Sequence, residues 1–163
     1  PGGRLPISFP RSVGHLPCYY TMLPGGSDRY LEGPREALFP FGHGLSYCQF
    51  RYGELRVEKL AEPYSFAVAV EVENLGEMTA DEVVQLYVTD LESSVVTPER
   101  TLQGFRRITL APGEKREVRF RLGQEAFRLM DVRYRWVVEP GAFRIAVGAS
   151  SQDIRAEREI MIE

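Results

Sequence analysis

Three residues of the types used by nucleophilic hydrolases occur near the start of the chain: Ser12, His15 and Asp28. A Ser-His-Asp triad requires the three side chains to converge in space, and closeness along the chain does not supply that geometry. The chain also lacks the G-x-S-x-G sequence of a nucleophile elbow. The sequence therefore predicts no triad, and we interpret His15 and His43 as hydrogen-bonded structural residues.

Paired carboxylates, the groups with which glycosidases cleave sugars, occur at Asp81-Glu82 and at Asp90 and Glu92. These pairs flank an apolar stretch, as acids at strand ends and in turns do. Acid catalysis requires a carboxyl group whose pKa is raised by burial, and no acid lies in a context that indicates such burial. We therefore predict no catalytic residue in this chain.

The sequence offers no motif for a cofactor or a metal ion, and neither is expected. Gly42 and Gly44 match the start of a G-x-G-x-x-G loop, but no βαβ pattern surrounds them, so a tight turn is expected. Two Cys and two His without paired spacing do not make a zinc site, and residues 90–94 lack the ligand spacing of a calcium loop. Cys18 and Cys48 are expected to be free thiols, with a single bridge as the alternative.

Aromatic residues are the remaining candidates for binding. Tyr19 and Tyr20 follow Pro17 closely, and their flat apolar faces suit stacking on a sugar ring. The alternative, which we favour, is that they anchor their segment to a neighbouring domain. Trp136 lies in a strand-like sequence and is expected in the core or between sheets, with an exposed ligand platform as the alternative.

The overall composition is that of a folded protein. The chain has 163 residues, 44% of them apolar, and a formal net charge of −3, which predicts one domain or one domain plus an extension. No apolar run approaches the roughly 20 residues that cross a bilayer, and the arginines are scattered among acids. Neither a membrane nor nucleic acid is expected as a partner. The chain begins at Pro1 without Met or a signal segment, so we expect a piece of a longer protein.

A change in composition near residue 54 divides the chain. Residues 1–54 hold 7 of the 11 prolines, 9 of the 15 glycines and half of the aromatic residues. Pro removes a backbone donor and Gly weakens regular elements, so this segment should be mostly irregular. It is too aromatic for a disordered linker. We expect it to lie on a protein surface and to bury its rings there.

Residues 55–163 alternate apolar and polar side chains, as half-buried strands do. Turn sequences at Asn74-Leu75-Gly76, Pro112-Gly113 and Pro140-Gly141 separate the runs, and one short helix-like stretch lies at 124–130. Within 83–88 both faces are apolar, which indicates a central strand. The pattern predicts an all-β fold, an antiparallel β-sandwich. Its strands are expected in eight ranges: 55–60, 65–73, 83–88, 102–110, 117–122, 134–138, 143–147 and 154–162.

The segment Phe39-Pro40-Phe41-Gly42-His43-Gly44-Leu45-Ser46-Tyr47 resembles the (Y/F)-P-F-G-x-G-L-S-Y segment of family 3 glycoside hydrolases, the β-glucosidase/β-xylosidase family. The resemblance extends over nearly the whole chain. It departs from the family pattern at Cys48, where Thr is more frequent, and at His43, where Tyr often stands. Further stretches similar to the family are 3–11, 14–20, 81–88, 102–107, 110–114, 136–143 and 147–155.

This resemblance implies a parent with a TIM-like barrel, an α/β sandwich and a fibronectin type III-like domain, in that order. The nucleophilic Asp belongs to the barrel and the acid/base Glu to the second domain, both outside this chain. Residues 1–54 then correspond to the tail of the α/β sandwich and a connector. Residues 55–163 correspond to the immunoglobulin-like, fibronectin type III-like domain. The parent would be a retaining exo-glycosidase acting on β-linked glucose, xylose or related sugars.

The expected role of the chain is therefore structural, with the barrel and α/β-sandwich domains of the same parent as partners and a homodimer as a further option. Tyr19 and Tyr20 are the candidates for a contact at the active-site rim. A carbohydrate-binding module and an immunoglobulin-like interaction module remain alternatives, although the outward strand positions are mostly Arg and Glu. Free thiols and the absence of an N-x-S/T sequence favour the cytoplasm, with export as the alternative.

Overall fold

The computed structural model describes residues 1–23 and 36–163 and has ten strands and two short 3₁₀ helices. The alternating sequence forms the strands, and no α-helix occurs in the described ranges. The helices are η1 (Val13–His15) and η2 (Gln124–Ala126). The strands are β1 (Phe50–Tyr52), β2 (Arg56–Lys59), β3 (Phe66–Asn74), β4 (Ala80–Asp90), β5 (Thr101–Leu110), β6 (Lys115–Leu122), β7 (Arg128–Met130), β8 (Trp136–Val138), β9 (Gly141–Gly148) and β10 (Ile154–Ile162).

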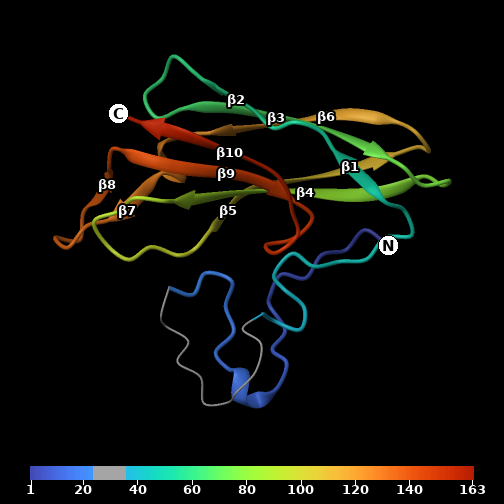
Figure 1. Ribbon diagram of the computed structural model, residues 1–163, viewed down its shortest axis with the longest axis horizontal. Coiled ribbons are helices and arrows are strands. Elements are labelled where there is room, and N and C mark those ends of the chain that lie inside the picture. The colour runs from blue at the N-terminus through green and yellow to red at the C-terminus, as the bar shows by residue number, and fades with distance from the viewer. Residues whose placement is uncertain (24–35) are drawn as a thin grey trace.

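Two four-stranded antiparallel sheets lie face to face and form a β-sandwich (Figure 1). In one sheet β3 pairs with β1, β2 and β6, and the other has the order β10-β9-β4-β5. Strands β7 and β8 form a separate two-stranded hairpin. The predicted sandwich is confirmed, and β4 is the central strand that residues 83–88 indicated.

The core lies between the two sheets and consists of the side chains that the alternation pattern assigned to one face. Val68, Val70 and Val72 of β3 are at most 1% exposed, while Glu71 between them faces solvent. Leu86 of β4 lies opposite Val147 of β9 in the register, and both are fully buried. Because burying one such side chain contributes about 1.5–3 kcal/mol, this double layer is the main source of stability.

The stretch expected to be helical is only one helical turn. Residues 124–126 form η2, and the chain then enters β7. Phe127 packs edge to face against Phe66 and Phe143, with ring centroids 5.4 and 5.3 Å away. Burial of Phe127 and Leu129, with Arg128 between them exposed, gives the period of a strand. The prediction of a helix through residue 130 is therefore wrong.

The expectation that Trp136 lies in the core is also wrong. Its side chain is 58% exposed, and the Arg128 guanidinium lies 4.6 Å from the ring centroid. Among residues 1–23 and 36–163, strand β8 pairs only with β7, and no second sheet of these residues covers this position. The alternation pattern correctly indicated a strand at Trp136. The ring is exposed to solvent because no sheet in the described part of the chain packs over it.

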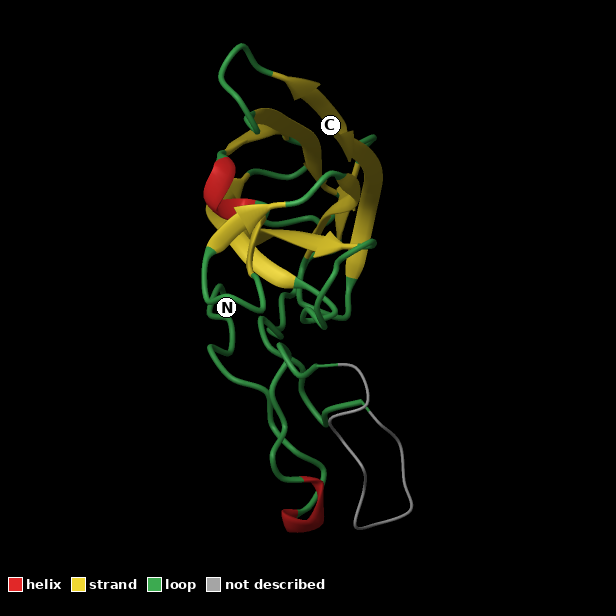
Figure 2. Ribbon diagram, turned by 90° about the vertical axis from the view of Figure 1, so that its left-hand side faces the viewer, coloured by secondary structure: helices red, strands yellow, loops and turns green. Residues whose placement is uncertain are grey.

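The residues before the sandwich form an arm, which we define as residues 1–23 and 36–49. It extends from the sheet that contains β4 and reaches well beyond the sandwich (Figure 2). Apart from η1 it is irregular, as its Pro and Gly content predicted. Strand β1 follows the arm directly and pairs with β3 through Phe50 and Asn74, so the sandwich sheet begins before residue 54.

Candidate interdomain docking site

The two limbs of the arm are held together as a ribbon. The Leu5 N–H donates to the His43 carbonyl and the Gly42 N–H donates to the Leu5 carbonyl, both at 2.8 Å. Further out, the Phe9 N–H donates to the Phe39 carbonyl at 2.8 Å, and their rings meet edge to face. Because these bonds satisfy backbone groups outside any regular strand, the ribbon is an ordered part of the molecule.

Gln85 in the middle of β4 fastens the arm to the sandwich. Its Nε2 donates to the carbonyls of Gly42 at 3.0 Å and of Ala149 at 2.7 Å. Its Oε1 accepts a hydrogen bond from the Tyr87 hydroxyl at 2.6 Å. The residue is 3% exposed, and an unmade hydrogen bond in such a place costs about 1–3 kcal/mol. The side chain therefore links the arm, β4 and the turn after β9.

The two glycines of the F-G-H-G sequence allow the arm to approach this closely. Gly42 has φ +79°, a backbone conformation that favours glycine. At Gly44 an added Cβ would lie 2.4 Å from the Gly3 carbonyl oxygen and 2.6 Å from Cδ of Arg4. The expected tight turn is confirmed, and its function is close packing within the arm and against β4.

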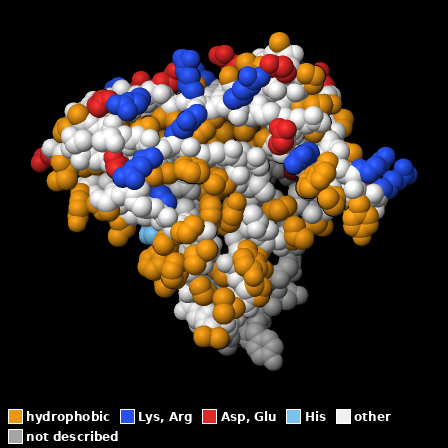
Figure 3. Space-filling model, turned by 180° about the vertical axis from the view of Figure 1, so that it is seen from behind, with side chains coloured by type: hydrophobic (Ala, Val, Ile, Leu, Met, Phe, Trp, Pro, Cys, Tyr) orange, Lys and Arg blue, Asp and Glu red, His pale blue; other side chains and the backbone are white. Residues whose placement is uncertain are grey.

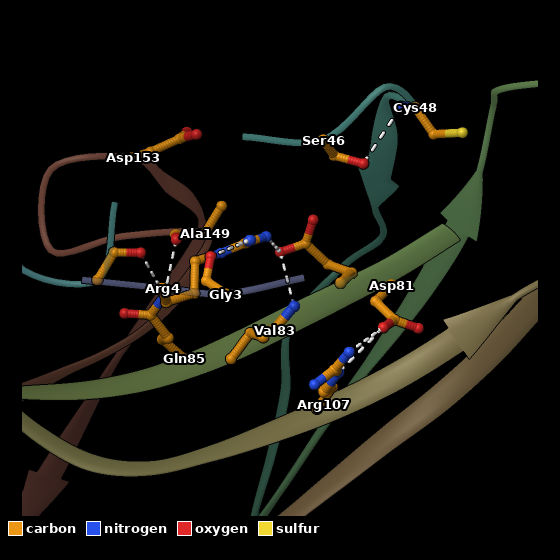
Figure 4. Close-up of polar contacts among 12 residues, drawn as sticks. Gly3, Arg4, Ser46, Cys48, Asp81, Val83, Gln85, Arg107, Ala149 and Asp153 are labelled. Carbon is orange, nitrogen blue, oxygen red and sulfur yellow. Dashed lines mark hydrogen bonds and ion pairs between the residues drawn. The ribbon is translucent and has the colours of Figure 1, made fainter. Parts of the chain in front are cut away.

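A buried ion pair forms the second attachment (Figure 4). Nη2 of Arg4 donates to Oε1 of Glu82 at 2.9 Å, and the side chains are 10% and 4% exposed. The Val83 N–H donates to the same oxygen at 3.0 Å. Burial, reinforced by the nearby charge of Glu82, raises the pKa of the Tyr52 hydroxyl above its usual 10. An ion pair in this setting depends on both partners, because either charge alone would be buried without compensation.

The two candidate tyrosines lie in different environments. Tyr20 stacks on Phe41 with ring centroids 4.1 Å apart, and its hydroxyl accepts a hydrogen bond from the Leu102 N–H at 3.3 Å. It also contacts the edge of Tyr87. Tyr19 remains exposed on the arm. Tyr20 thus fixes the arm to the sheet, whereas the Tyr19 ring is available for contacts outside the chain.

Beyond these attachments the arm exposes an unusual amount of apolar surface. Figure 3 shows hydrophobic side chains gathered on the part that extends from the sandwich. Monomeric proteins rarely expose contiguous apolar patches larger than a few hundred Å², and such patches mark interaction sites. The exposed large apolar residues of the arm are Ile7, Phe9, Val13, Leu16, Tyr19, Leu23, Leu38, Phe39, Leu45 and Tyr47.

The hydrolase-type residues of the arm have structural surroundings. Nδ1 of His15 accepts a hydrogen bond from the Arg11 N–H at 3.3 Å, and the His43 ring stacks on Phe39 at 5.1 Å. Ser12 precedes η1, and its carbonyl accepts a hydrogen bond from the His15 N–H. Asp28 lies outside the described residues.

The candidate carboxylates Asp81 and Asp90 are held by hydrogen bonds, Asp81 of β4 to residues of β5 and Asp90 to its own loop. Hydrogen bonds from Thr109, at 2.6 Å, and from Arg107 hold the pKa of Asp81 below its usual value. Burial raises the pKa of Asp90, which accepts a hydrogen bond from the Glu92 N–H at 3.2 Å. Asp81 and Asp90 thus each have a structural role.

No metal site is visible in the part of the chain that the structure describes, because no three His, Cys, Asp or Glu side chains are grouped to hold an ion. Cys18 and Cys48 are free thiols, and Cys48 is buried with its Sγ 3.3 Å from the Met78 carbonyl. Across residues 1–23 and 36–163, no helix has the length and apolar character needed to span a bilayer.

Sequence reasoning missed Gln85 and Arg4 as the residues that attach the arm. One signal was present, because Gln85 is the polar residue within the apolar run 83–88. A buried amide in a central strand requires partners, and the nearby carbonyls of Gly42 and Ala149 provide them. Nothing in the sequence indicated that Arg4 would pair with Glu82, which is 78 residues away.

A family model described as a fibronectin type III-like domain matches residues 82–151. The β-xylosidase of Formosa agariphila is 45% identical over 158 residues, which cover 93% of this chain and 22% of that protein. Thermostable β-glucosidase B of Acetivibrio thermocellus is 40% identical over 178 residues, covering 99% of this chain and 23% of that protein. The chain thus spans about a fifth of the length of these relatives.

A solved structure of a β-glucosidase from Erythrobacter marinus matches with a TM-score of 0.91 and 38% identity, over 100% of this chain and 22% of that one. A β-glucosidase from Listeria innocua, solved in complex with glucose, matches with a TM-score of 0.86 and 33% identity, over 99% of this chain and 24% of that one. Both matches include the arm as well as the sandwich. The chain therefore belongs to the family 3 glycoside hydrolases, the β-glucosidase/β-xylosidase family, and carries their fibronectin type III-like domain.

Proposed function

We propose that this chain is the non-catalytic C-terminal part of a retaining exo-acting β-glycosidase, and that it docks on the catalytic domains of the same parent. The observation that carries the proposal is the arm, which is firmly attached at one end and apolar at the other. Gln85 and the Arg4–Glu82 pair fix its orientation. Ten large apolar side chains of the arm are exposed.

The proposed partner surface is apolar and belongs to the barrel and α/β-sandwich domains. Covering the exposed rings and aliphatic chains of the arm contributes about 25 cal/mol per Å² of apolar area removed from water. An arm that is already ordered loses little conformational entropy on docking. Val13 and Leu16, which are 86% and 60% exposed near the end of the arm, are the residues from which we expect the largest contribution.

A chimeric enzyme tests this docking role. The segment of the Formosa agariphila β-xylosidase that matches this chain is replaced by the 163 residues, and hydrolysis of an aryl β-xyloside and the melting temperature are measured. We expect an active, cooperatively unfolding chimera. The double substitution Val13→Ser and Leu16→Ser should lower both the melting temperature and the activity.

The matched control is Phe105→Ser and Met161→Ser, which removes two apolar side chains of similar exposure from the sandwich strands. Equal losses in both variants would contradict a specific role of the arm. Hydrolysis of the substrate by the isolated 163-residue chain would contradict the non-catalytic role. If the isolated chain forms a dimer and Val13→Ser abolishes that dimer, the partner of the arm surface is a second copy of this chain instead.

Tyr19 is the proposed contact with the active-site rim, since its ring is exposed on the arm whereas Tyr20 is held against Phe41. In the chimera, Tyr19→Ala should raise KM at an unchanged melting temperature. Tyr20→Ala should instead lower the melting temperature, because it removes a packed ring. A KM that does not respond to Tyr19→Ala would remove Tyr19 from the rim.

A further inference from the structure

A polar cavity lies at the end of the sandwich where the arm joins it. Its volume is about 650 Å³, within the range of small-molecule sites. It opens between β1 of one sheet and β4 and β10 of the other. In Figure 4 the side chains of Asp153 and Ser46 lie on the same side of Arg4. The residues that define its chemistry are Arg4, Ser46, Arg51, Glu82, Asp153 and Arg155.

The charges around the cavity are already paired. Arg4 pairs with Glu82, and Nε of Arg155 lies 2.6 Å from Oδ1 of Asp153. Arg51 pairs with Glu73, which is outside the cavity lining. Among the described residues that line the cavity, an anion would therefore find no unpaired cation, and a cation would find no unpaired carboxylate. The lining favours a ligand without net charge.

The same groups retain hydrogen-bonding capacity. A guanidinium has five N–H donors and a carboxylate about four acceptor positions, so each ion pair uses only part of its capacity. Nε of Arg4 is buried and has no partner in the described part of the chain. Ser46 adds a hydroxyl, and Phe50 and Leu75 add apolar surface. A matching ligand is neutral, donates and accepts several hydrogen bonds, and has C–H faces.

We propose that this cavity binds a neutral polyhydroxylated molecule of about the size of a monosaccharide. Hydroxyl groups donate to Asp153 and accept from Arg155 at the same time, which neither an inorganic anion nor an apolar molecule does. This binding site is separate from the docking surface, because the apolar residues at the outer end of the arm do not line it.

The test is a titration of the ¹⁵N-labelled 163-residue chain, with glucose, xylose, glycerol and sulfate as probes and amide chemical shifts as the readout. We expect saturable shifts at Ser46, Arg51 and Arg155 with glucose or xylose. Arg155→Gln should weaken binding about tenfold, the effect of losing a hydrogen bond to a charged group. Asp153→Asn should weaken it as well.

Arg144→Gln is the matched control. Arg144 pairs with Glu159 at 2.8 Å on the same sheet but does not line the cavity, so its replacement should leave binding unchanged. Sulfate that binds more tightly than either sugar would overturn the proposal. The same holds for shifts confined to the β7–β8 hairpin around Trp136, and for the absence of any saturable shift.

The chimeric enzyme separates this proposal from the docking role. Sugar binding at the cavity should persist in the chimera, whether or not substitutions in the arm impair its stability. Binding that is present in the isolated chain but lost in the stable chimera would mean that another part of the enzyme fills the cavity, and would overturn the proposal while leaving docking intact.

Discussion

Gly42 lies so close to Gln85 that a Cβ on Gly42 would be 2.0 Å from Oε1 of Gln85. Glycine is therefore required by the neighbouring side chain as well as by its φ of +79°. Gly113 has a similar φ of +71°, but an added Cβ there meets nothing within 4 Å. The two glycines thus separate the effect of backbone conformation from that of the contact.

We expect Gly113→Ala to destabilise the chain by about 1 kcal/mol through its backbone conformation alone. Gly42→Ala should cost a further 1–3 kcal/mol, roughly the range for overpacking a tight site. Urea unfolding of the two variants measures the difference. Equal losses of unfolding free energy in the two variants would show that the arm can move away from β4 without destabilising the chain.

Replacing Gln85 tests the hydrogen bonds beneath the arm. Gln85→Leu keeps most of the side-chain volume but leaves the carbonyls of Gly42 and Ala149 without their donor and the Tyr87 hydroxyl without its acceptor. Because each of these three unsatisfied buried groups costs about 1–3 kcal/mol, we expect a loss of about 3–9 kcal/mol in the free energy of unfolding. Gln152→Leu, at an exposed position, is the control and should be nearly neutral. A loss below 1 kcal/mol for Gln85→Leu would contradict the role given to this residue.

The buried and exposed ion pairs should respond differently to loss of a carboxylate. Glu82→Gln leaves the charge of Arg4 buried without a counter-charge, which typically costs about 3–5 kcal/mol. Glu117→Gln removes the partner of Arg56 on the exposed face of β6 and should change stability little. The double variant Arg4→Met with Glu82→Leu should recover much of the loss. Failure to recover would indicate that the pair contributes more than mutual charge compensation.

Acid should weaken the turn between β7 and β8. The backbone N–H and guanidinium of Arg135, with the Arg133 N–H, hold the pKa of Asp131 below its usual 3.8. A lowered folded-state pKa means that the carboxylate contributes stability above the unfolded value, and that this contribution is lost as pH falls through the folded value.

Asp131→Asn should therefore lower the free energy of unfolding at pH 7 and have less effect near pH 2, with the difference closing below about pH 4. Thermal unfolding at several pH values measures the gap between the two proteins. A gap that stays constant with pH would mean that the Asp131 charge is not involved.

The sequence predicted the sandwich well because its strands are defined by local alternation. Val68, Val70 and Val72 face one way in any strand register, so their common burial follows from the period of two. The exposure of Trp136 could not be predicted in this way. It depends on whether another element covers β8, and that is determined by the whole topology.

The attachment site was less predictable for the same physical reason. Gly42 and Gly44 indicated a turn, and Gln85 stood out as a polar residue in an apolar run, but the sequence did not show that Gln85 and Arg4 would pack against these glycines. Contacts between residues 78 positions apart, such as Arg4 and Glu82, arise only when the arm has folded back on the sheet. The apolar character of the arm was visible in composition, whereas the split between the packed Tyr20 and the exposed Tyr19 required the structure.

The order of strands has a consequence for self-association. Unpaired strand edges invite other chains to add to a sheet, and charged side chains discourage such addition. The strands at the edges here carry many charges: Arg155, Glu157, Arg158 and Glu159 on β10, Arg106 and Arg107 on β5, Arg116, Glu117, Arg119 and Arg121 on β6, and Arg56, Glu58 and Lys59 on β2. Aggregation of the isolated chain should therefore occur between folded molecules, through the exposed apolar side chains of the arm. Covering these side chains should dissolve the aggregates without unfolding and refolding of the chain.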